Sequence, residues 1–192
     1  MAHADIATVI LAGGRATRFP GKLEAAFDGE PLLLRVYANV RDAAPIVIAG
    51  RGSFTEALDE RLECPLVIDR WPDRGPLGGI VSAASAVHAP RIFVVAGDAP
   101  HVTTAVLDAL AQAWQPGDEA AVPMHGTQIE PLAALYDRLA ILREGAALLA
   151  ERESASMHAL LERLRVRRVV LDAANFTNVN TANDLVNSQG TP

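Results

Sequence analysis

The sequence predicts an α/β protein: a single domain with a three-layer α/β/α arrangement around a mostly parallel sheet. Short apolar, β-branched runs alternate with segments in which apolar residues recur three and four positions apart. The run Ile92–Ala96 is apolar at every position, which is typical of a parallel strand covered on both faces. Strands and helices that alternate in this way predict βαβ units with helices on both faces of the sheet.

Each expected element shows one of the two periodicities. The strands are short apolar runs at Ala7–Leu11, Ile46–Ala49, Leu66–Ile68, Ile92–Ala96, Ala120–Pro123 and Val166–Leu171. The helices have an amphipathic period and cover Leu32–Asp42, Phe54–Leu62, Leu77–His88, Thr103–Trp114 and Leu139–Arg152. A further strand, Glu130–Tyr136, follows a turn at His125–Gln128, and antiparallel pairing of this strand makes the sheet mixed.

Length and composition favour one folded unit. The chain has 192 residues, of which 50% are hydrophobic, so it can bury a core without disulfides or metals. We expect a domain over residues 1–187 and a flexible tail over 188–192.

Charge and cysteine usage exclude several classes of protein. The formal net charge of -6 argues against a nucleic-acid partner and against an anionic membrane surface, so phosphate must be bound locally. Cys64 is the only cysteine, which leaves no intramolecular disulfide and no thiolate metal cluster. The apolar run Ile6–Ala12 is too short for a signal or a membrane span. A cytoplasmic protein is expected.

Glycines and cations gather directly after the first expected strand. The segment contains Leu11, Ala12, Gly13, Gly14, Arg15, Arg18 and Lys22. Ligands of open α/β sheets bind outside the carboxyl ends of the strands. Glycines let backbone N–H groups approach a phosphate, and three cations neutralise much of a triphosphate. This clustering favours a phosphate-binding loop over a simple turn with solvated cations.

The spacing of this segment matches neither of two common nucleotide motifs. A dinucleotide fingerprint requires G-x-G-x-x-G, and a P-loop requires a Ser or Thr after its lysine. Here Leu23 follows Lys22, and Pro20 interrupts the start of any helix. The loop is therefore of another kind.

The segment LAGGRATRFPGK, at residues 11–22, resembles the signature of nucleotidyltransferases that act on sugar phosphates and cofactors. Three later segments extend the resemblance in the expected order, namely GPLGG at 75–79, GDAP at 97–100 and FTNVNT at 176–181. Over nearly its whole length the chain is similar to the molybdenum cofactor guanylyltransferases. The resemblance implies a Rossmann-like nucleotidyltransferase fold and transfer of GMP from GTP to molybdopterin, with release of pyrophosphate.

Asp98 is the candidate metal ligand. It directly follows the strand Ile92–Ala96 and Gly97, across the switch point from the glycine segment, where a carboxylate can ligate Mg²⁺ that keeps waters and substrate phosphates. The alternative, a cap for the next helix, is better served by Thr103 or Thr104. Lys22 and secondarily Arg18 would offset charge on the phosphates, so the expected catalytic residues are Lys22, Arg18 and Asp98.

Several residues are expected to bind the nucleotide or the acceptor. They are Leu11, Ala12, Gly13, Gly14, Arg15, Lys22, Asp69, Asp98, Asn178 and Asn180. The resemblance implies that Asp69 helps bind the guanine nucleotide and that the loop with Asn178 and Asn180 faces the metal and the acceptor. Taken alone, these asparagines before Thr181 are typical of helix capping.

Two departures from the family pattern keep other functions open. The family usually has Gly-x-x-Asp-Lys where this chain has Phe19-Pro20-Gly21-Lys22, and Ala49 stands where an asparagine is expected. The Pro-Gly-Lys variant also resembles cytidylyltransferases that activate sugar acids. The partners are therefore GTP or CTP, a phosphorylated pterin acceptor and other proteins of molybdenum cofactor biosynthesis. A cytidylyltransferase for molybdopterin or a sugar acid, and a non-catalytic nucleotide-binding protein, are the alternatives.

Glu130 and a cluster of arginines have simpler explanations than a place in a binding site. Glu130 opens an expected strand, where an exposed glutamate is a more ordinary account than a place in the acceptor pocket. The cluster Arg163, Arg165, Arg167 and Arg168 lies at a helix-to-strand junction of an acidic protein, which favours a solvated face over a polyanion site.

Overall fold

One mixed sheet forms the centre of the molecule. A computed structural model describes residues 3–13, 21–50, 52, 54–151, 155–179, 181 and 184. Within these residues, eight strands form the sheet in the order β10-β7-β9-β6-β1-β4-β5, with the short β8 paired to β7. A separate hairpin joins β2 (Ala26–Phe27) to β3 (Glu30–Pro31).

Most strands of the sheet run in one direction. Their bounds are β1 Ile6–Leu11, β4 Ile46–Gly50, β5 Leu66–Ile68, β6 Arg91–Ala96, β7 Ala120–His125, β8 Gln128–Ile129, β9 Ala133–Asp137 and β10 Val166–Val170. β1 pairs in parallel with β4 and β6, β4 with β5, and β10 with β7. β9 runs antiparallel to both of its neighbours, β6 and β7. The predicted α/β class and mixed sheet are confirmed.

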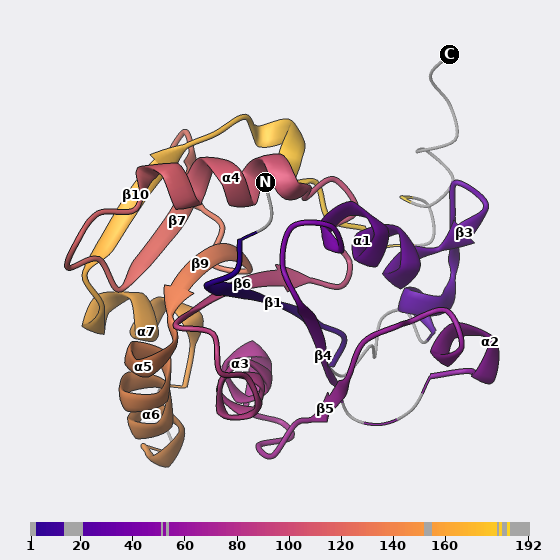
Figure 1. Cartoon of the computed structure of the whole chain (residues 1–192), viewed down its shortest axis with the longest axis horizontal. Helices are drawn as coiled ribbons and strands as arrows, with labels where there is room; N and C mark the ends of the chain where they lie inside the picture. The colour runs from indigo at the N-terminus through magenta and orange to yellow at the C-terminus, as the bar shows by residue number, and fades with distance from the viewer. Residues whose placement is uncertain are drawn as a thin grey trace.

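Helices cover both faces of the sheet. Their bounds are α1 Leu32–Val40, α2 Glu56–Asp59, α3 Gly75–Ala86, α4 Thr104–Ala113, α5 Arg138–Ala140, α6 Ala146–Ala150 and α7 Met157–Arg163. α1 and α4 lie on one face, and α3 with α5, α6 and α7 lies on the other (Figure 1). This is the predicted three-layer arrangement. Among the described residues, no helix combines the length and the apolar character needed to cross a bilayer.

Alternate residues of the central strands feed two separate cores. Ile10 and Phe93 pack with α1 and α4, whereas Val9 and Val94 pack with α3. All four side chains are fully buried. Burying each such side chain contributes about 1.5–3 kcal/mol. Because both faces are covered, the strands need no polar residues in alternation, which explains their continuous apolar runs.

The structure departs from the predicted elements in several places. The helix expected over Phe54–Leu62 is reduced to α2, and β2, β3, β8 and α7 lie where no element was expected. Two other departures have a visible physical cause. The helix expected over Leu139–Arg152 is divided by a π-helical segment, Ile141–Gly145, between α5 and α6. A Cβ atom at Gly145 would lie 2.7 Å from Cγ2 of Val81, so only glycine lets this segment approach α3 so closely. The strand expected from Glu130 begins at Ala133 instead, because the Ala133 amide donates to the Glu130 carbonyl and closes a bend.

Candidate active site

The carboxyl ends of the parallel strands meet at one edge of the sheet. The Gly97 amide donates to the Leu11 carbonyl over 2.9 Å, and the Ala12 amide donates to the Ala49 carbonyl over 2.8 Å. The chain passes from β1 outward to β4 and β5 and then returns through β6 to the other side of β1. The switch point between β1 and β6, where open α/β sheets bind ligands, therefore lies between Leu11 and Gly97.

At this switch point two backbones come unusually close. A Cβ atom at Gly97 would lie 2.8 Å from the Leu11 carbonyl oxygen and 3.3 Å from Cδ2 of Leu23. Only glycine fits between the end of β1 and the segment that follows the glycine loop. Asp98 is thereby held directly beside the end of β1.

Lys22 and Asp98, which the sequence predicts as catalytic residues, are brought together. Gly21 adopts a left-handed conformation with φ of 72°, and Lys22 then begins a short 3₁₀ helix that ends at Glu24. The Lys22 ammonium pairs with Oδ2 of Asp98, and the two side chains are 16% and 25% exposed. One cation and one carboxylate thus face each other, partly shielded from water, beside the end of β1.

The FTNVNT segment also reaches Asp98. The Val179 amide donates to the Asp98 carbonyl over 3.0 Å, and the neighbouring Asn178 is exposed. Further along, the Thr181 amide donates to the Asp184 carboxylate over 2.8 Å, while Thr181 Oγ1 accepts from the Asp184 amide over 3.3 Å. This reciprocal pair is a capping arrangement, as the residue types suggest. The exposed Asn178 precedes Val179 and therefore lies at the carboxyl edge, near the Asp98 carbonyl.

Asp69 organises the loop in front of α3. Its Oδ1 atom accepts from the Trp71 amide over 2.8 Å and from the Ser82 hydroxyl over 3.3 Å. Ser82 in turn accepts from the Arg70 amide over 2.9 Å. Asp69 follows β5, so it lies at the same edge as Asp98 but two strands away from β1. Sequence reasoning missed Ser82, which is one of two serines in a helix that is otherwise apolar.

Four of the expected site residues lie outside the described residues. They are Gly14, Arg15, Arg18 and Asn180. Of the remaining candidates, Leu11, Ala12, Gly13, Lys22, Asp69, Asp98 and Asn178 all lie at the carboxyl edge.

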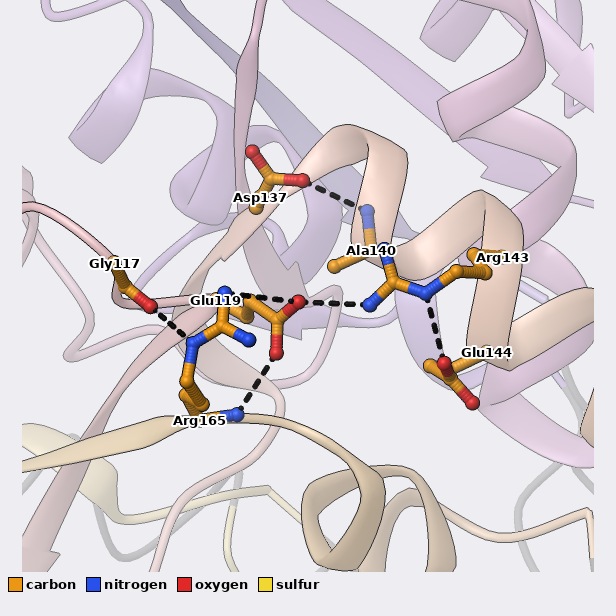
Figure 2. Close-up of polar contacts among 7 residues, drawn as sticks. All are labelled: Gly117, Glu119, Asp137, Ala140, Arg143, Glu144 and Arg165. Atoms are coloured by element: carbon orange, nitrogen blue, oxygen red, sulfur yellow. Dashed lines mark hydrogen bonds and ion pairs between the residues drawn. The ribbon is translucent and has the colours of Figure 1, made fainter.

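A second polar cluster lies at the opposite, amino edge of the sheet, where β7 and β10 begin. Figure 2 shows its contacts. Glu119 is only 7% exposed, and it accepts from the Arg165 amide over 3.0 Å and from the Arg143 guanidinium over 2.7 Å. Burial raises the pKa of Glu119. The hydrogen bonds and positive charges of Arg165 and Arg143 together outweigh this effect, so the pKa lies below the ordinary value for a glutamate. The cluster ties β7, the π-helical segment and the start of β10 together.

The arginine cluster near β10 is largely paired within the molecule. Arg163 bonds to Glu151 over 2.6 Å, Arg165 to the Gly117 carbonyl over 2.6 Å, and Arg167 to Asp118 over 2.6 Å. These contacts satisfy guanidinium groups that a polyanion would otherwise bind. The cluster was expected to be a solvated face, and in the structure three of its four arginines bond to other residues of the chain.

The fold and the site define a class of protein. A mixed α/β sheet with a glycine segment after its first strand, and a lysine and an aspartate facing each other at the switch point, is the arrangement of a nucleotidyltransferase. Residues 8–169 match the MobA-like NTP transferase domain, and the chain belongs to this family. The resemblance recognised in the sequence is confirmed.

Curated relatives agree over most of the chain. A protein from Bacillus licheniformis, named as a probable molybdenum cofactor guanylyltransferase, is 30% identical and covers 92% of this chain and 93% of its own length. A molybdenum cofactor guanylyltransferase from Xanthomonas euvesicatoria is 33% identical and covers 90% of this chain and 88% of its own length.

Solved structures show the same fold. Molybdopterin-guanine dinucleotide biosynthesis protein A from Archaeoglobus fulgidus is 26% identical, with a TM-score of 0.77 over 95% of this chain and 96% of its own. A CMP:2-keto-3-deoxy-manno-octonic acid synthetase complexed with CTP gives a TM-score of 0.77 over 95% of both chains. At 17% identity, the second likeness concerns the fold alone.

Proposed function

We propose that this chain transfers GMP from GTP to molybdopterin and releases pyrophosphate. The observation that carries the proposal is the meeting of Lys22 and Asp98 at the switch point of a MobA-like domain. The names of the relatives from Bacillus and Xanthomonas support guanylyl transfer and a pterin acceptor. We place the reaction in the cytoplasm, where GTP and other proteins of molybdenum cofactor biosynthesis would supply the two substrates.

The reaction requires positioning more than covalent chemistry from the protein. A phosphate oxygen of the acceptor attacks the α-phosphorus of GTP, the bond from that phosphorus to the bridging oxygen breaks, and pyrophosphate leaves. The backbone of Leu11–Gly13 would face the nucleotide, and Lys22 would stabilise the negative charge that develops on the phosphates. Asp69 would serve the nucleotide side through the loop it organises, and Asn178 the acceptor side.

Asp98 can serve as a ligand for Mg²⁺ when substrate phosphates and waters supply the remaining ligands of the ion. Within the described ranges, no three His, Cys, Asp or Glu side chains gather into a metal site. A single carboxylate fits Mg²⁺, which commonly keeps waters and takes its remaining oxygens from phosphates. When bound, the ion would neutralise charge on the phosphates.

The Lys22–Asp98 ion pair indicates how the free site accommodates its own charges. Each side chain is the counter-charge of the other until a substrate arrives. Triphosphate offers Lys22 a new anionic partner, and Mg²⁺ offers Asp98 a new cationic one. The exchange keeps both groups paired, so neither charge is left unpartnered in a partly shielded site.

Pyrophosphate release in the presence of molybdopterin tests the proposal. The purified chain is mixed with Mg²⁺, molybdopterin and each of the four nucleoside triphosphates in turn. We expect turnover with GTP and the formation of a guanylylated pterin, identified by mass spectrometry.

Two other outcomes would replace the proposal. Turnover with CTP and none with GTP would identify a cytidylyltransferase, and a sugar acid in place of molybdopterin would then test the acceptor. Binding of GTP with no pyrophosphate release, for any acceptor, would indicate a nucleotide-binding protein without catalysis.

A further inference from the structure

A stacked pair of rings lies at the carboxyl edge beyond Asp98. The His125 ring, at the end of β7, stacks on Phe176 with centroids 5.6 Å apart and planes at 10°. His125 Nε2 also contacts Oε1 of Glu130 over 2.8 Å. The His125 side chain is 18% exposed and that of Glu130 is 26% exposed, so their contact is partly shielded from water.

Glu130 is a fixed support for the His125 ring. Its amide donates to the Pro123 carbonyl over 3.0 Å, and its carbonyl accepts from the Ala133 amide over 3.1 Å. The Tyr136 hydroxyl, from the fully buried Tyr136, donates to the neighbouring Pro131 carbonyl over 2.7 Å. The carboxylate that holds His125 therefore projects from backbone that is bonded to β7 and β9.

Phe176 begins the segment that reaches Asp98. The segment 176–179 is anchored at its far end by Val179, which packs with Phe27 and Leu32 and donates its amide to the Asp98 carbonyl. At its near end, Phe176 is 8% exposed, and one contact of its ring is with His125. Between the two buried anchors, Thr177 and Asn178 are exposed at the carboxyl edge.

We propose that His125 is a positioning residue for the acceptor. Held by Glu130, its ring fixes Phe176, and Phe176 fixes one end of the segment that presents Asn178 beside Asp98. The acceptor side of the site is thereby built from β7 and the 130–133 bend as well as from the end of β6. We call the contacts from Glu130 through His125 to Phe176 the clamp. The role of the clamp in positioning the acceptor rests on the proposed function, whereas the clamp itself does not.

Amide hydrogen exchange on the whole, ligand-free chain tests the clamp. In His125→Ala, exchange in a peptide covering residues 176–179 should be at least about tenfold faster than in the unaltered chain. Glu130→Ala should act in the same direction, and Glu130→Gln, which keeps an oxygen that can accept from the imidazole, should restore most of the protection. His158→Ala, on the exposed surface of α7, is the matched control and should leave this peptide unchanged. Unchanged exchange in both alanine variants of the clamp would overturn the inference.

Steady-state kinetics test the consequence for the acceptor. His125→Ala should raise the KM for molybdopterin by at least about fivefold and leave the KM for GTP within about twofold. Equal increases in both KM values, or no increase in either, would overturn the role in positioning the acceptor. Lack of turnover by the unaltered chain with GTP and molybdopterin would instead refute the proposed function, and the exchange experiment would still decide the clamp.

Discussion

The two edges of the sheet use charge in opposite ways. At the amino edge, Glu119 is buried and bonded to two arginines, and Arg167 is bonded to Asp118. At the carboxyl edge, Lys22 and Asp98 pair with each other, and Asp98 follows Gly97, where only glycine allows the backbone to lie so close to the end of β1. The first arrangement joins three elements into one body, and the second leaves groups that a substrate can take over.

This difference predicts where a mutation costs activity and where it costs stability. Charges that are satisfied by the fold contribute to the free energy of unfolding, and their loss leaves the chemistry intact. Charges that are satisfied only until a ligand binds contribute to the reaction, and their loss leaves the fold intact. Substitutions at the two edges can separate the two contributions.

The largest effect is expected at the carboxyl edge. Lys22→Ala and Asp98→Asn should each lower kcat/KM for GTP by roughly 10²–10³-fold, as for the loss of one group that stabilises transition-state charge. Each variant also leaves a partner that is only 16% or 25% exposed without its counter-charge, so a loss of about 1–3 kcal/mol in the free energy of unfolding is expected, and activity is measured where the variant is folded. Pyrophosphate release and urea denaturation measure the two quantities.

A matched ion pair elsewhere controls for that result. Arg163→Ala removes the pair between α7 and Glu151 and should leave kcat/KM unchanged. Equal losses of activity in Arg163→Ala and Lys22→Ala would remove the distinction between the edges.

Neighbouring glycines of α3 should differ in their effects. A Cβ atom at Gly78 would lie 2.7 Å from the Trp71 carbonyl oxygen and 3.1 Å from Oδ1 of Asp69. Gly78→Ala must therefore displace the loop in front of α3 that Asp69 organises. We expect a destabilisation of about 1–3 kcal/mol, as for overpacking, together with a higher KM for GTP. In Gly79→Ala the nearest atom is Cδ2 of Leu11 at 3.4 Å, and the gain in helix propensity is up to about 1 kcal/mol. The two variants are compared by thermal denaturation and by their KM for GTP. Equal stabilities and equal KM values would show that the loop adapts to the added methyl group.

At the amino edge, Glu119→Ala should affect stability alone. Loss of its charged hydrogen bonds to Arg143 and Arg165 should lower the free energy of unfolding by about 2 kcal/mol. In a chain of this length each kcal/mol corresponds to roughly 2–4 °C in Tm. The kcat/KM of the folded variant should equal that of the unaltered chain. A loss of activity at a temperature where the variant is folded would contradict the division between the edges.

The smallest effect concerns acid pH. Burial raises the pKa values of Glu119 and Asp118. Hydrogen bonds from arginine side chains and backbone amides outweigh this effect, so both folded-state pKa values lie below the unfolded ones. Their contribution to stability is therefore complete above the unfolded values, at about pH 4, and is lost as pH falls through the folded ones. Urea denaturation from pH 7 downward should show a flatter acid limb in Glu119→Gln than in the unaltered chain.

The sheet was largely predictable from the sequence, because its strands are buried on both faces. Runs such as Ile92–Ala96 have no polar interruption, and the helices between them have a clear period. The β2–β3 hairpin and α7 were not predicted. Each strand of the hairpin has two residues. α7 is short, although its Ser156 cap, which accepts from the Ala159 amide, is a recognisable start.

The placement of a candidate site residue was predictable where it follows a strand closely. Asp98 comes just after β6, so strand direction brings it to the carboxyl edge, whereas the pairing of Lys22 with Asp98 depends on the course of the chain between β1 and the 3₁₀ helix Lys22–Glu24. The contacts of Ser82 and His125 were not predicted, because they are made in three dimensions between distant parts of the chain. Ser82 meets Asp69 from a different element, and His125 stacks on a phenylalanine that follows β10. Periodicity and spacing contain no information on such contacts.

The bond between Val179 and Asp98 has a consequence for the order of assembly during synthesis. Val179 follows the last strand of the described sheet, whereas the glycine segment follows the first. On the ribosome, β1 and β6 are made well before residues 176–179. The bond that joins this segment to Asp98 can therefore form only after every described strand has been translated.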